Sequence, residues 1–371
     1  MVTDSNDIEA IRQAVRSIMK QFGPDYWREV DQQRTFPTHF FDVMGEAGYF
    51  GTLIPQRLGG SEAGPLAASA IIEEINRQGG DAASINAQMT ICNVLLRHGS
   101  EGQKRYLPQI ADGSLRCLGV AATEADSGAD MTHLQSVARR DGSGWILNAK
   151  KMFISMAEHT QLMFVLLQAD EGPTLFLVDR EQAGAAIEIR PMPMVVNRMT
   201  TAVFIDDLRV PDSARVGPVG KGLDCLMGGF ALRRIFAAAE SLGHARFLLD
   251  RSLEHARSRE ANGRAIGQHQ GVQYPLTQAY AKIEAADLMR QDALRQLLAN
   301  EDAGGRSALA KILASEAAWE MTRAAMTTFG GWALTTEMHI ERKLRESTVF
   351  IFNNLLLNYV AQRVLKLPRP S

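Results

Sequence analysis

The sequence predicts a mostly helical α+β protein in which a β domain separates two helical regions. Apolar residues recur at helical spacing from Ile8 to about residue 118. Between about 119 and 217 they lie in short segments rich in β-forming residues, and from Gly222 onward helical spacing returns. This order differs from the alternating strand and helix pattern of dinucleotide-binding folds. The expected domains are a helical N-terminal domain (1–118), a middle antiparallel β domain (119–220) and a C-terminal helical bundle (221–371).

The first helical region contains two clear amphipathic stretches. Ile8, Ile11, Val15, Ile18 and Met19 fall on one helical face. A second stretch covers 67–77 and is bounded by the glycine-rich segments LGGSEAGP and GG, which favour turns. Both are therefore predicted to be helices with one buried face.

The middle region reads as β structure, and the last region as long helices. The predicted strands are WILNA, FISM, LMFVLLQ, TLFLVD, AIEIR and AVFIDDLRV. Gly217–Gly222 is rich in glycine, but no parallel strand precedes it, so we interpret it as a β-to-helix connection and not as a phosphate loop. The expected long helical stretches are 224–257, 268–299 and 306–329.

Composition excludes several classes of function. The formal net charge of −2 provides no basic excess for binding nucleic acid. The chain has only three widely spaced cysteines, which fits a reducing cytoplasm better than a disulfide framework. No histidine spacing indicates a metal site, and no apolar run reaches the roughly 18 residues of a membrane span. The N-terminus carries acidic residues and matches neither a signal nor a transit peptide.

The most informative motif is ATEADSGAD at 122–130, where small residues and hydroxyls let backbone N–H groups approach a flavin and its pyrophosphate. Five other motifs accompany it. One precedes it, GSEGQKRYLP (99–108), and four follow: LNAKKMFIS (147–155), FIDDLRVP (204–211), REANGRAIGQHQ (259–270) and FGG (329–331). The short segments IER (340–342) and RE (345–346) come after these. In content, order and spacing this set resembles the acyl-CoA dehydrogenase family over nearly the whole chain.

The resemblance implies a three-domain fold that binds FAD between the β domain and a C-terminal four-helix bundle. It also implies an acyl-CoA or acyl-carrier-protein thioester as substrate and an electron-transferring flavoprotein as partner. The usual assembly is a homotetramer, with a dimer or a heteromer as alternatives. The residues that it assigns to FAD are Val120, Ala122, Thr123, Gly128, Ala129, Phe153, Ser155, Arg259, Gln270, Gly330 and Gly331. Of these, Arg259 and Gln270 are expected to reach the FAD of a neighbouring subunit.

Three positions depart from the family pattern. Ala129 stands where the family usually has Ser, Asn262 where it has Phe, and Thr327 where it has Gln. Each change removes one polar or stacking contact, worth on the order of 1 kcal/mol.

The catalytic base of the family is absent from this sequence. Asn354 occupies the usual position of the glutamate, and residues 347–371 contain no Asp or Glu. Arg233 occupies the alternative position on another helix, next to Arg234, which matches the substrate-side arginine. An amide cannot accept a proton near neutral pH. Glu240 lies seven residues after Arg233 on the same helical face and is a weak candidate for the missing base.

Three functions are compatible with these residues. The first is an FAD-dependent oxidoreductase that acts at the α and β carbons of an acyl thioester with a non-standard base, or in a variant reaction such as enoyl reduction or desulfination. The second is a non-catalytic subunit of a heteromeric acyl-CoA dehydrogenase. The third is a flavin-dependent monooxygenase on the same fold, which needs no α-proton base.

Overall fold

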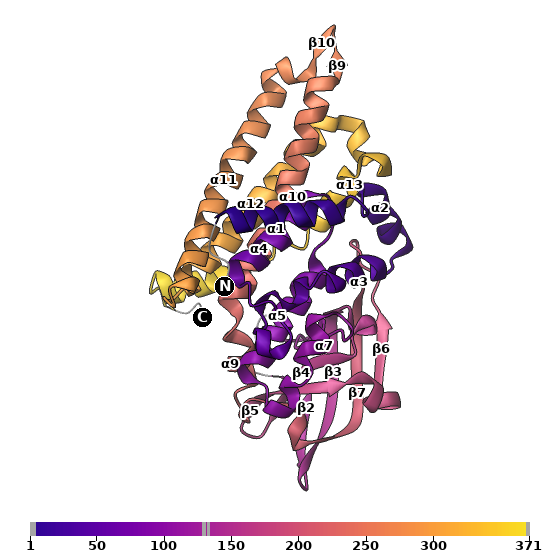
Figure 1. Ribbon diagram of the computed structural model, residues 1–371, viewed down its shortest axis with the longest axis vertical. Coiled ribbons are helices and arrows are strands. Elements are labelled where there is room, and N and C mark those ends of the chain that lie inside the picture. Colours follow the sequence, from indigo (N-terminus) through magenta and orange to yellow (C-terminus); the bar gives the residue numbers. More distant parts are fainter. Residues whose placement is uncertain (1–4, 128–130, 132–133, 369–371) are drawn as a thin grey trace. The chain divides into compact units, whose positions relative to one another are not determined.

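The computed structural model describes residues 5–127, 131 and 134–368, and the chain divides into two compact units (Figure 1). One unit comprises residues 34–64 and 83–230, and the other comprises 2–33, 65–82 and 231–371. The predicted N-terminal helical region therefore contributes helices to both units. This division was not evident from periodicity, because α4 pairs with helices far away in the sequence.

The first unit is built on a mixed sheet in the order β6-β7-β3-β2-β4-β5-β8, with β1 beside β4. The strands are β1 (Gly119–Ala121), β2 (Val137–Asp141), β3 (Gly144–Ser155), β4 (Leu162–Ala169), β5 (Gly172–Asp179), β6 (Ile187–Pro191), β7 (Thr200–Pro211) and β8 (Arg215–Val216). Most neighbouring strands are antiparallel, as expected, but β1 and β2 each pair with β4 in parallel. Because β1 arrives from the helical region and not through a hairpin, no tight turn imposes the antiparallel direction.

The central strands β4 and β5 are buried on both faces and separate two hydrophobic clusters. Phe164, Leu166 and Leu175 belong to the cluster shared with the helices of this unit. The alternate residues Val165 and Phe176 belong to the cluster inside the sheet domain. The helices of this unit are α3 (Thr38–Glu46), α5 (Ala83–His98), α6 (Glu101–Lys104), α7 (Leu107–Ala111), α8 (Arg180–Ala183) and α9 (Gly222–Met227).

The second unit is helical, apart from a small hairpin formed by β9 (Glu260–Ala261) and β10 (Arg264–Ala265). Its helices are α1 (Ser5–Met19), α2 (Pro24–Gln33), α4 (Pro65–Arg77), α10 (Phe230–Ser258), α11 (Gln270–Leu298), α12 (Gly304–Phe329), α13 (Ile340–Ser347) and α14 (Asn354–Tyr359). Figure 1 shows α10 and α11 running side by side to the hairpin that connects them.

Most of the predicted helices are confirmed, with one correction. Val15 and Met19 of α1 are buried, and 67–77 lies in α4, whose residues from Ala67 to Asn76 are all buried. The stretches 268–299 and 306–329 correspond to α11 and α12. The stretch 224–257 is two helices, because the chain turns at Gly228 and Gly229 between α9 and α10.

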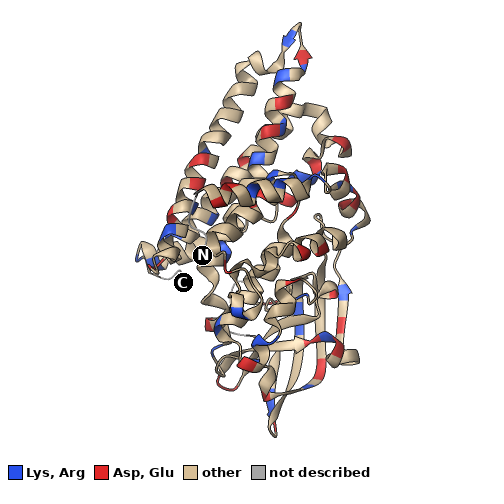
Figure 2. Ribbon diagram, in the orientation of Figure 1, with Lys and Arg blue, Asp and Glu red and all other residues tan. Residues whose placement is uncertain are grey.

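A buried ion-pair cluster connects four helices of the second unit. Glu73 of α4 is 2% exposed, and its carboxylate is bonded by Arg12 of α1 (2.6 Å), Arg290 of α11 (3.0 Å) and Arg246 of α10. Arg290 and Arg246 also bond Asp287. Figure 2 shows charged residues of both signs on these helices. Each buried charge is therefore compensated by an opposite one, as buried ions require.

The backbones of α4 and α10 also lie close together at Glu73. A Cβ atom at Gly243 of α10 would lie 2.2 Å from the carbonyl oxygen of Glu73. Only glycine fits there without moving one of the helices. Glu73 therefore marks a point where both the backbone and the charges of the two helices meet.

Replacing Glu73 by Gln leaves Arg12, Arg246 and Arg290 without their shared carboxylate. We expect the free energy of unfolding to fall by about 3–5 kcal/mol, because breaking a buried pair on one side strands the remaining charges. Urea denaturation at neutral pH, followed by circular dichroism, measures this change. As a control, Glu188→Gln removes an exposed carboxylate paired with Arg190 and should leave the free energy of unfolding nearly unchanged, because solvent screens this pair. Equal losses in the two variants would contradict this account of the cluster.

The stability of the wild type and that of the Glu73→Gln variant should depend differently on pH. Burial alone would raise the pKa of Glu73, but the three arginines outweigh burial and hold this pKa below its ordinary value. A lowered pKa stabilises the fold fully above the unfolded-state pKa of about 4.3 and loses this contribution as pH falls further. The stability difference between the wild type and Glu73→Gln should therefore shrink on acidification below that pH.

Candidate functional site

The loop after β1 is held in place by a buried ion pair. Lys151 of β3 bonds Glu124 through its Nζ at 2.7 Å and also donates to the carbonyl of Ala122 at 3.2 Å. The neighbouring N–H of Met152 donates to the carbonyl of Thr123 at 2.9 Å. The first residues of the ATEADSGAD motif are thus fixed to the middle of β3.

Glu124 is ionised within a nearly complete set of donors. Besides Lys151, its carboxylate accepts the backbone N–H groups of Gln135 (2.7 Å) and Ser136 (3.1 Å). Burial would raise the pKa of Glu124, but these hydrogen bonds outweigh burial and lower the pKa. The role of Glu124 is therefore structural, since a carboxylate with these partners has little capacity to take up a proton.

A β-bulge in β3 presents Phe153 to solvent. The pairing of β3 with β7 shifts between Lys151, opposite Val203, and Ile154, opposite Thr201. Phe153 lies in this bulge with a φ of +58°, and its side chain is 54% exposed. A bulky residue with a positive φ is strained by about 1–3 kcal/mol, and strained residues cluster at functional sites. The ring is available as a stacking surface.

The structure brings several predicted cofactor residues of the first unit together. Ala122 and Thr123 lie on the loop that is hydrogen-bonded to Lys151 and Met152 of β3. Phe153 and Ser155 follow these two residues in the same strand. Val120 is half-buried in β1, one residue before Ala121. Gly128 and Ala129 lie outside the described residues.

The predicted cofactor residues of the second unit lie at the far ends of its long helices. Arg259 and Gln270 are exposed on either side of the β9–β10 hairpin, and the carbonyl of Arg259 accepts the N–H of Ile266 at 2.8 Å. Gly330 ends α12 with φ +57° and ψ −133°, a conformation open essentially to glycine alone. A Cβ atom at Gly330 or at Gly331 would meet nothing within 4 Å among the described residues.

The hairpin explains one departure from the family pattern. Asn262 and Gly263 form its turn with φ values of +54° and +76°. An Asn-Gly pair with two positive φ values is the preferred two-residue hairpin turn. The Asn-Gly dipeptide was a signal for this hairpin in the sequence. Its two-residue strands were too short to give an alternating pattern.

The positions expected for the catalytic base lie on two helices of the second unit, α14 and α10. Asn354 is exposed at the start of α14, and Arg233 is exposed on α10. Arg234 is half-buried, donates to the carbonyl of Gly304 at 3.3 Å and lies over the Tyr359 ring at 4.3 Å. Burial lowers the pKa of Arg234. Glu240 is buried on α10.

Sequence reasoning missed a polar cluster beside Asn354. Lys311 of α12 donates to the carbonyls of Phe350 (2.7 Å) and Phe352 (3.4 Å) and to Oδ1 of Asn353 (2.6 Å). The Asn353 amide in turn donates to Ser315 at 2.9 Å. Burial lowers the pKa of Lys311 to about 8, opposed by the charge of Glu240. Lys311 and Asn353 therefore fix the segment that leads into α14.

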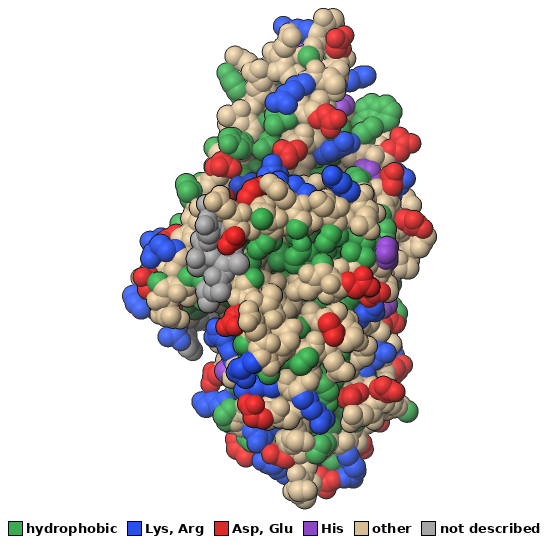
Figure 3. Space-filling view, viewed as in Figure 1, with side chains coloured by type: hydrophobic (Ala, Val, Ile, Leu, Met, Phe, Trp, Pro, Cys, Tyr) green, Lys and Arg blue, Asp and Glu red, His purple; other side chains and the backbone are tan. Residues whose placement is uncertain are grey.

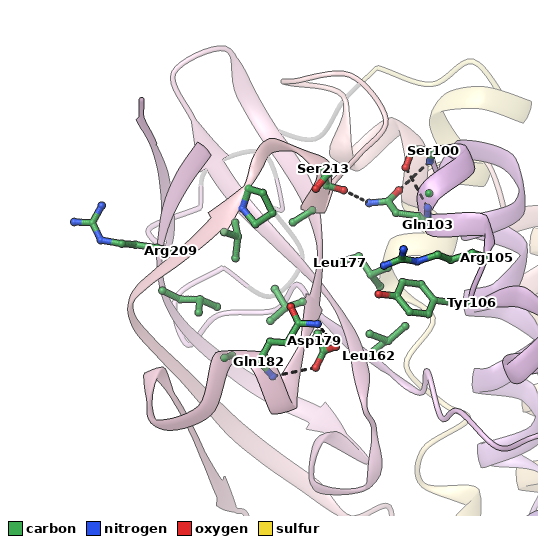
Figure 4. Close-up of a pocket in the computed structure, with 17 residues that line it drawn as sticks. Ser100, Gln103, Arg105, Tyr106, Leu162, Leu177, Asp179, Gln182, Arg209 and Ser213 are labelled. Atoms are coloured by element: carbon green, nitrogen blue, oxygen red, sulfur yellow. Dashed lines mark hydrogen bonds between the residues drawn. The ribbon is translucent and has the colours of Figure 1, made fainter. Parts of the chain in front are cut away.

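The first unit also contains a surface cavity of about 380 Å³ that the sequence did not predict (Figure 4). Leu162, Leu177 and Tyr106 contribute apolar surface, and Arg105 and Arg209 lie at its edge. Its Asp179 already caps α8 by accepting the N–H groups of Glu181 and Gln182. None of the predicted site residues lines this cavity.

Other classes of site are not evident in the described part of the chain. No group of three or more His, Cys, Asp or Glu residues could hold a metal ion among the residues that the structure describes. In the same residues, no helix combines the length and apolar character needed to cross a membrane. Figure 3 shows acidic and basic side chains interspersed over the visible face.

Comparisons with known proteins agree with these features. Family models for the N-terminal, middle and C-terminal domains of acyl-CoA dehydrogenases match residues 5–114, 119–207 and 220–353. The chain is 31% identical to the acyl-CoA dehydrogenase FadE12 of Mycobacterium tuberculosis over 99% of this chain and 98% of that protein. It is 28% identical to cyclohex-1-ene-1-carbonyl-CoA dehydrogenase of Syntrophus aciditrophicus, over 92% and 85% of the two chains.

Solved structures are similar over the whole chain. A glutaryl-coenzyme A dehydrogenase in complex with glutaryl-CoA aligns with a TM-score of 0.91 and 25% identity, covering 100% of this chain and 98% of that one. The FAD complex of PigA aligns with a TM-score of 0.91 and 26% identity, covering 99% of each chain. The identity to a curated acyl-CoA dehydrogenase and the three consecutive domain matches show that this chain belongs to the acyl-CoA dehydrogenase family.

Proposed function

We propose that this chain is an FAD-dependent oxidoreductase that acts at the α and β carbons of an acyl thioester. The observation that carries the proposal is the presentation of Phe153 on a strained bulge beside a loop anchored by Lys151 and Glu124. Such a rigid, exposed aromatic ring next to backbone groups of Thr123 fits a flat ring system that stacks and accepts hydrogen bonds. The FAD complex of a similar structure supports this assignment.

Within each unit, taken by itself, the residues present fit contacts to FAD. Phe153 would stack near the isoalloxazine ring, and Thr123 and Ser155 would hydrogen-bond it. The open space and glycine-only backbone at Gly330 allow a ligand to approach the main chain closely. When bound, FAD supplies a hydride acceptor for the β carbon of the substrate.

The proton at the α carbon has no conventional acceptor at the two usual positions. Asn354 carries an amide, which is no base near neutral pH, and Arg233 is a cation. Glu240 is buried, and its negative charge favours the protonated form of Lys311. We propose that Glu240 is the counter-charge of Lys311, which holds the segment before α14, and not a base. The proton acceptor then separates this chain from ordinary dehydrogenases.

One observation favours a second function, that of a non-catalytic subunit in a mixed assembly. The segment around Asn354 exposes a set of apolar side chains, with Phe352 at 79%. The set is Ile351, Phe352, Leu355 and Leu357. Exposed apolar groups of this kind are typical of a surface covered by another chain. A partner could then supply the missing carboxylate.

The visible spectrum of the protein purified alone separates these functions. We expect bound flavin whose absorbance bleaches anaerobically with at least one acyl-CoA. Flavin that stays oxidised with every thioester would move the assignment to a monooxygenase. A colourless chain that gains flavin only with a partner would establish the supporting-subunit function.

The ion pair under the motif should control flavin retention. Lys151→Met leaves Glu124 buried without its cation, which should lower the free energy of unfolding by about 3–5 kcal/mol and loosen the loop. We expect the FAD dissociation constant to rise at least about tenfold, measured by ultrafiltration and absorbance. Lys150→Met, at the exposed neighbouring position, is the matched control and should retain FAD. Equal FAD retention in the two variants would refute a role of the pair in the flavin site.

Glu240 can be tested against the role of a base. As the counter-charge of Lys311, Glu240→Gln should lower thermal stability and change the rate of flavin reduction less than about tenfold. Loss of a general base typically costs about 100- to 10,000-fold in rate with binding retained. Stopped-flow reduction with a bleaching acyl-CoA distinguishes these outcomes. A loss of the larger size would make Glu240 the proton acceptor.

A further inference from the structure

The turn between α9 and α10 places two glycines against two polar side chains of α5. A Cβ atom at Gly229 would lie 3.4 Å from Nδ2 of Asn93, which is the only atom found within 4 Å of it among the described residues. A Cβ atom at Gly228 would lie 3.4 Å from Nε2 of His98. Any other residue type at these positions would extend into the space in front of the two nitrogen atoms.

The amide of Asn93 is buried and lacks a partner. Asn93 is 7% exposed, and its Nδ2 makes no hydrogen bond among the described residues. The Nε2 of His98 is likewise buried without a partner there. By contrast, Gln88 on the same helix is fully bonded. Its amide donates to the carbonyls of Ile110 and Leu115, and its oxygen accepts the N–H of Cys117.

An unpaired buried amide is unfavourable, so a ligand atom is the natural partner for Asn93. Arg97, one turn along α5 from Asn93, donates to the carbonyl of Gly228 at 3.2 Å, whereas the residues that follow Asn93 directly are apolar. Val94, Leu95 and Leu226 of α9 belong to the same buried cluster as Ala122, and Val120 packs against it. Apolar surroundings therefore extend from the motif that carries Thr123 to the helix that carries Asn93. They suit a hydrocarbon chain with one polar group.

We propose that Asn93 and His98 bind an oxygen on the acyl chain of the substrate, so that the preferred thioesters carry a hydroxyl, carbonyl or carboxylate group beyond the reacting carbons. This inference rests on the proposed function. The Asn93 amide donates to such an oxygen, and the His98 ring nitrogen donates or accepts according to its tautomer. Asn93 and His98 are then specificity-determining residues and not catalytic ones.

The test compares matched thioesters by isothermal titration with the flavin-containing protein. The probes are butyryl-, hexanoyl- and octanoyl-CoA, each beside its ω-hydroxy and ω-carboxy counterpart. In at least one pair, the oxygenated member should bind at least about tenfold more tightly, the range of one buried hydrogen bond. The hydroxy and carboxy arms distinguish a neutral oxygen from an anionic one.

Variants connect this preference to the amide. Asn93→Leu should abolish the preference for the oxygenated member of the pair. Asn86→Leu is the control on the same helix, because Asn86 already accepts a hydrogen bond from Thr90 at 3.0 Å. Gly229→Ala, which narrows the space without removing the amide, should also reduce the preference and serves if Asn93→Leu does not fold.

The outcomes separate the two proposals. Plain thioesters that bind as tightly as all their oxygenated counterparts, or a preference that survives both Asn93→Leu and Gly229→Ala, would overturn the inference and leave the proposed function intact. Flavin-containing protein that binds none of the nine thioesters would remove the proposed function itself.

Discussion

The helical unit depends on one carboxylate that three arginines share. Glu73 lies on α4, and its partners come from α1, α10 and α11, so no one of these helices can shift without stranding a buried charge. The close contact at Gly243 requires the same arrangement of the backbone. Because α10 carries Arg234 and Glu240 and ends directly before Arg259, this cluster also fixes the helix that positions several candidate site residues.

Much of the fold follows from periodicity, because helices and strands with one buried face carry their pattern in the local sequence. The alternation of buried residues in β3 and the buried face of α1 are examples. Contacts between distant segments leave no such pattern. The position of α4 among α1, α10 and α11 arises from ion pairs between residues up to 217 positions apart, and nothing local to 65–77 indicates them.

The candidate site shows the same division. The ATEADSGAD motif gave a prediction of a flavin loop from the sequence alone, since its small residues have a local reason to be there. The backbone at Phe153 was not predictable, because a positive φ is unfavourable for phenylalanine and the surrounding sheet imposes it. The cluster of Lys311, Asn353 and Ser315 was also hidden, since it joins the middle of α12 to a segment about 40 residues later. Gly228 and Gly229 were visible as residues, but helical periodicity on both sides concealed the turn.

The strain at Phe153 bears on the choice between the proposed functions. A strained residue persists only where its surroundings impose it, and here a buried ion pair and two backbone hydrogen bonds maintain the neighbouring loop. A chain that merely supported a partner would need neither the exposed ring nor its rigid frame. The absent carboxylate concerns a different part of the reaction, the removal of a proton. The strain at Phe153 therefore favours a chain that holds the flavin itself, and the remaining difference between the functions is which chain accepts the proton.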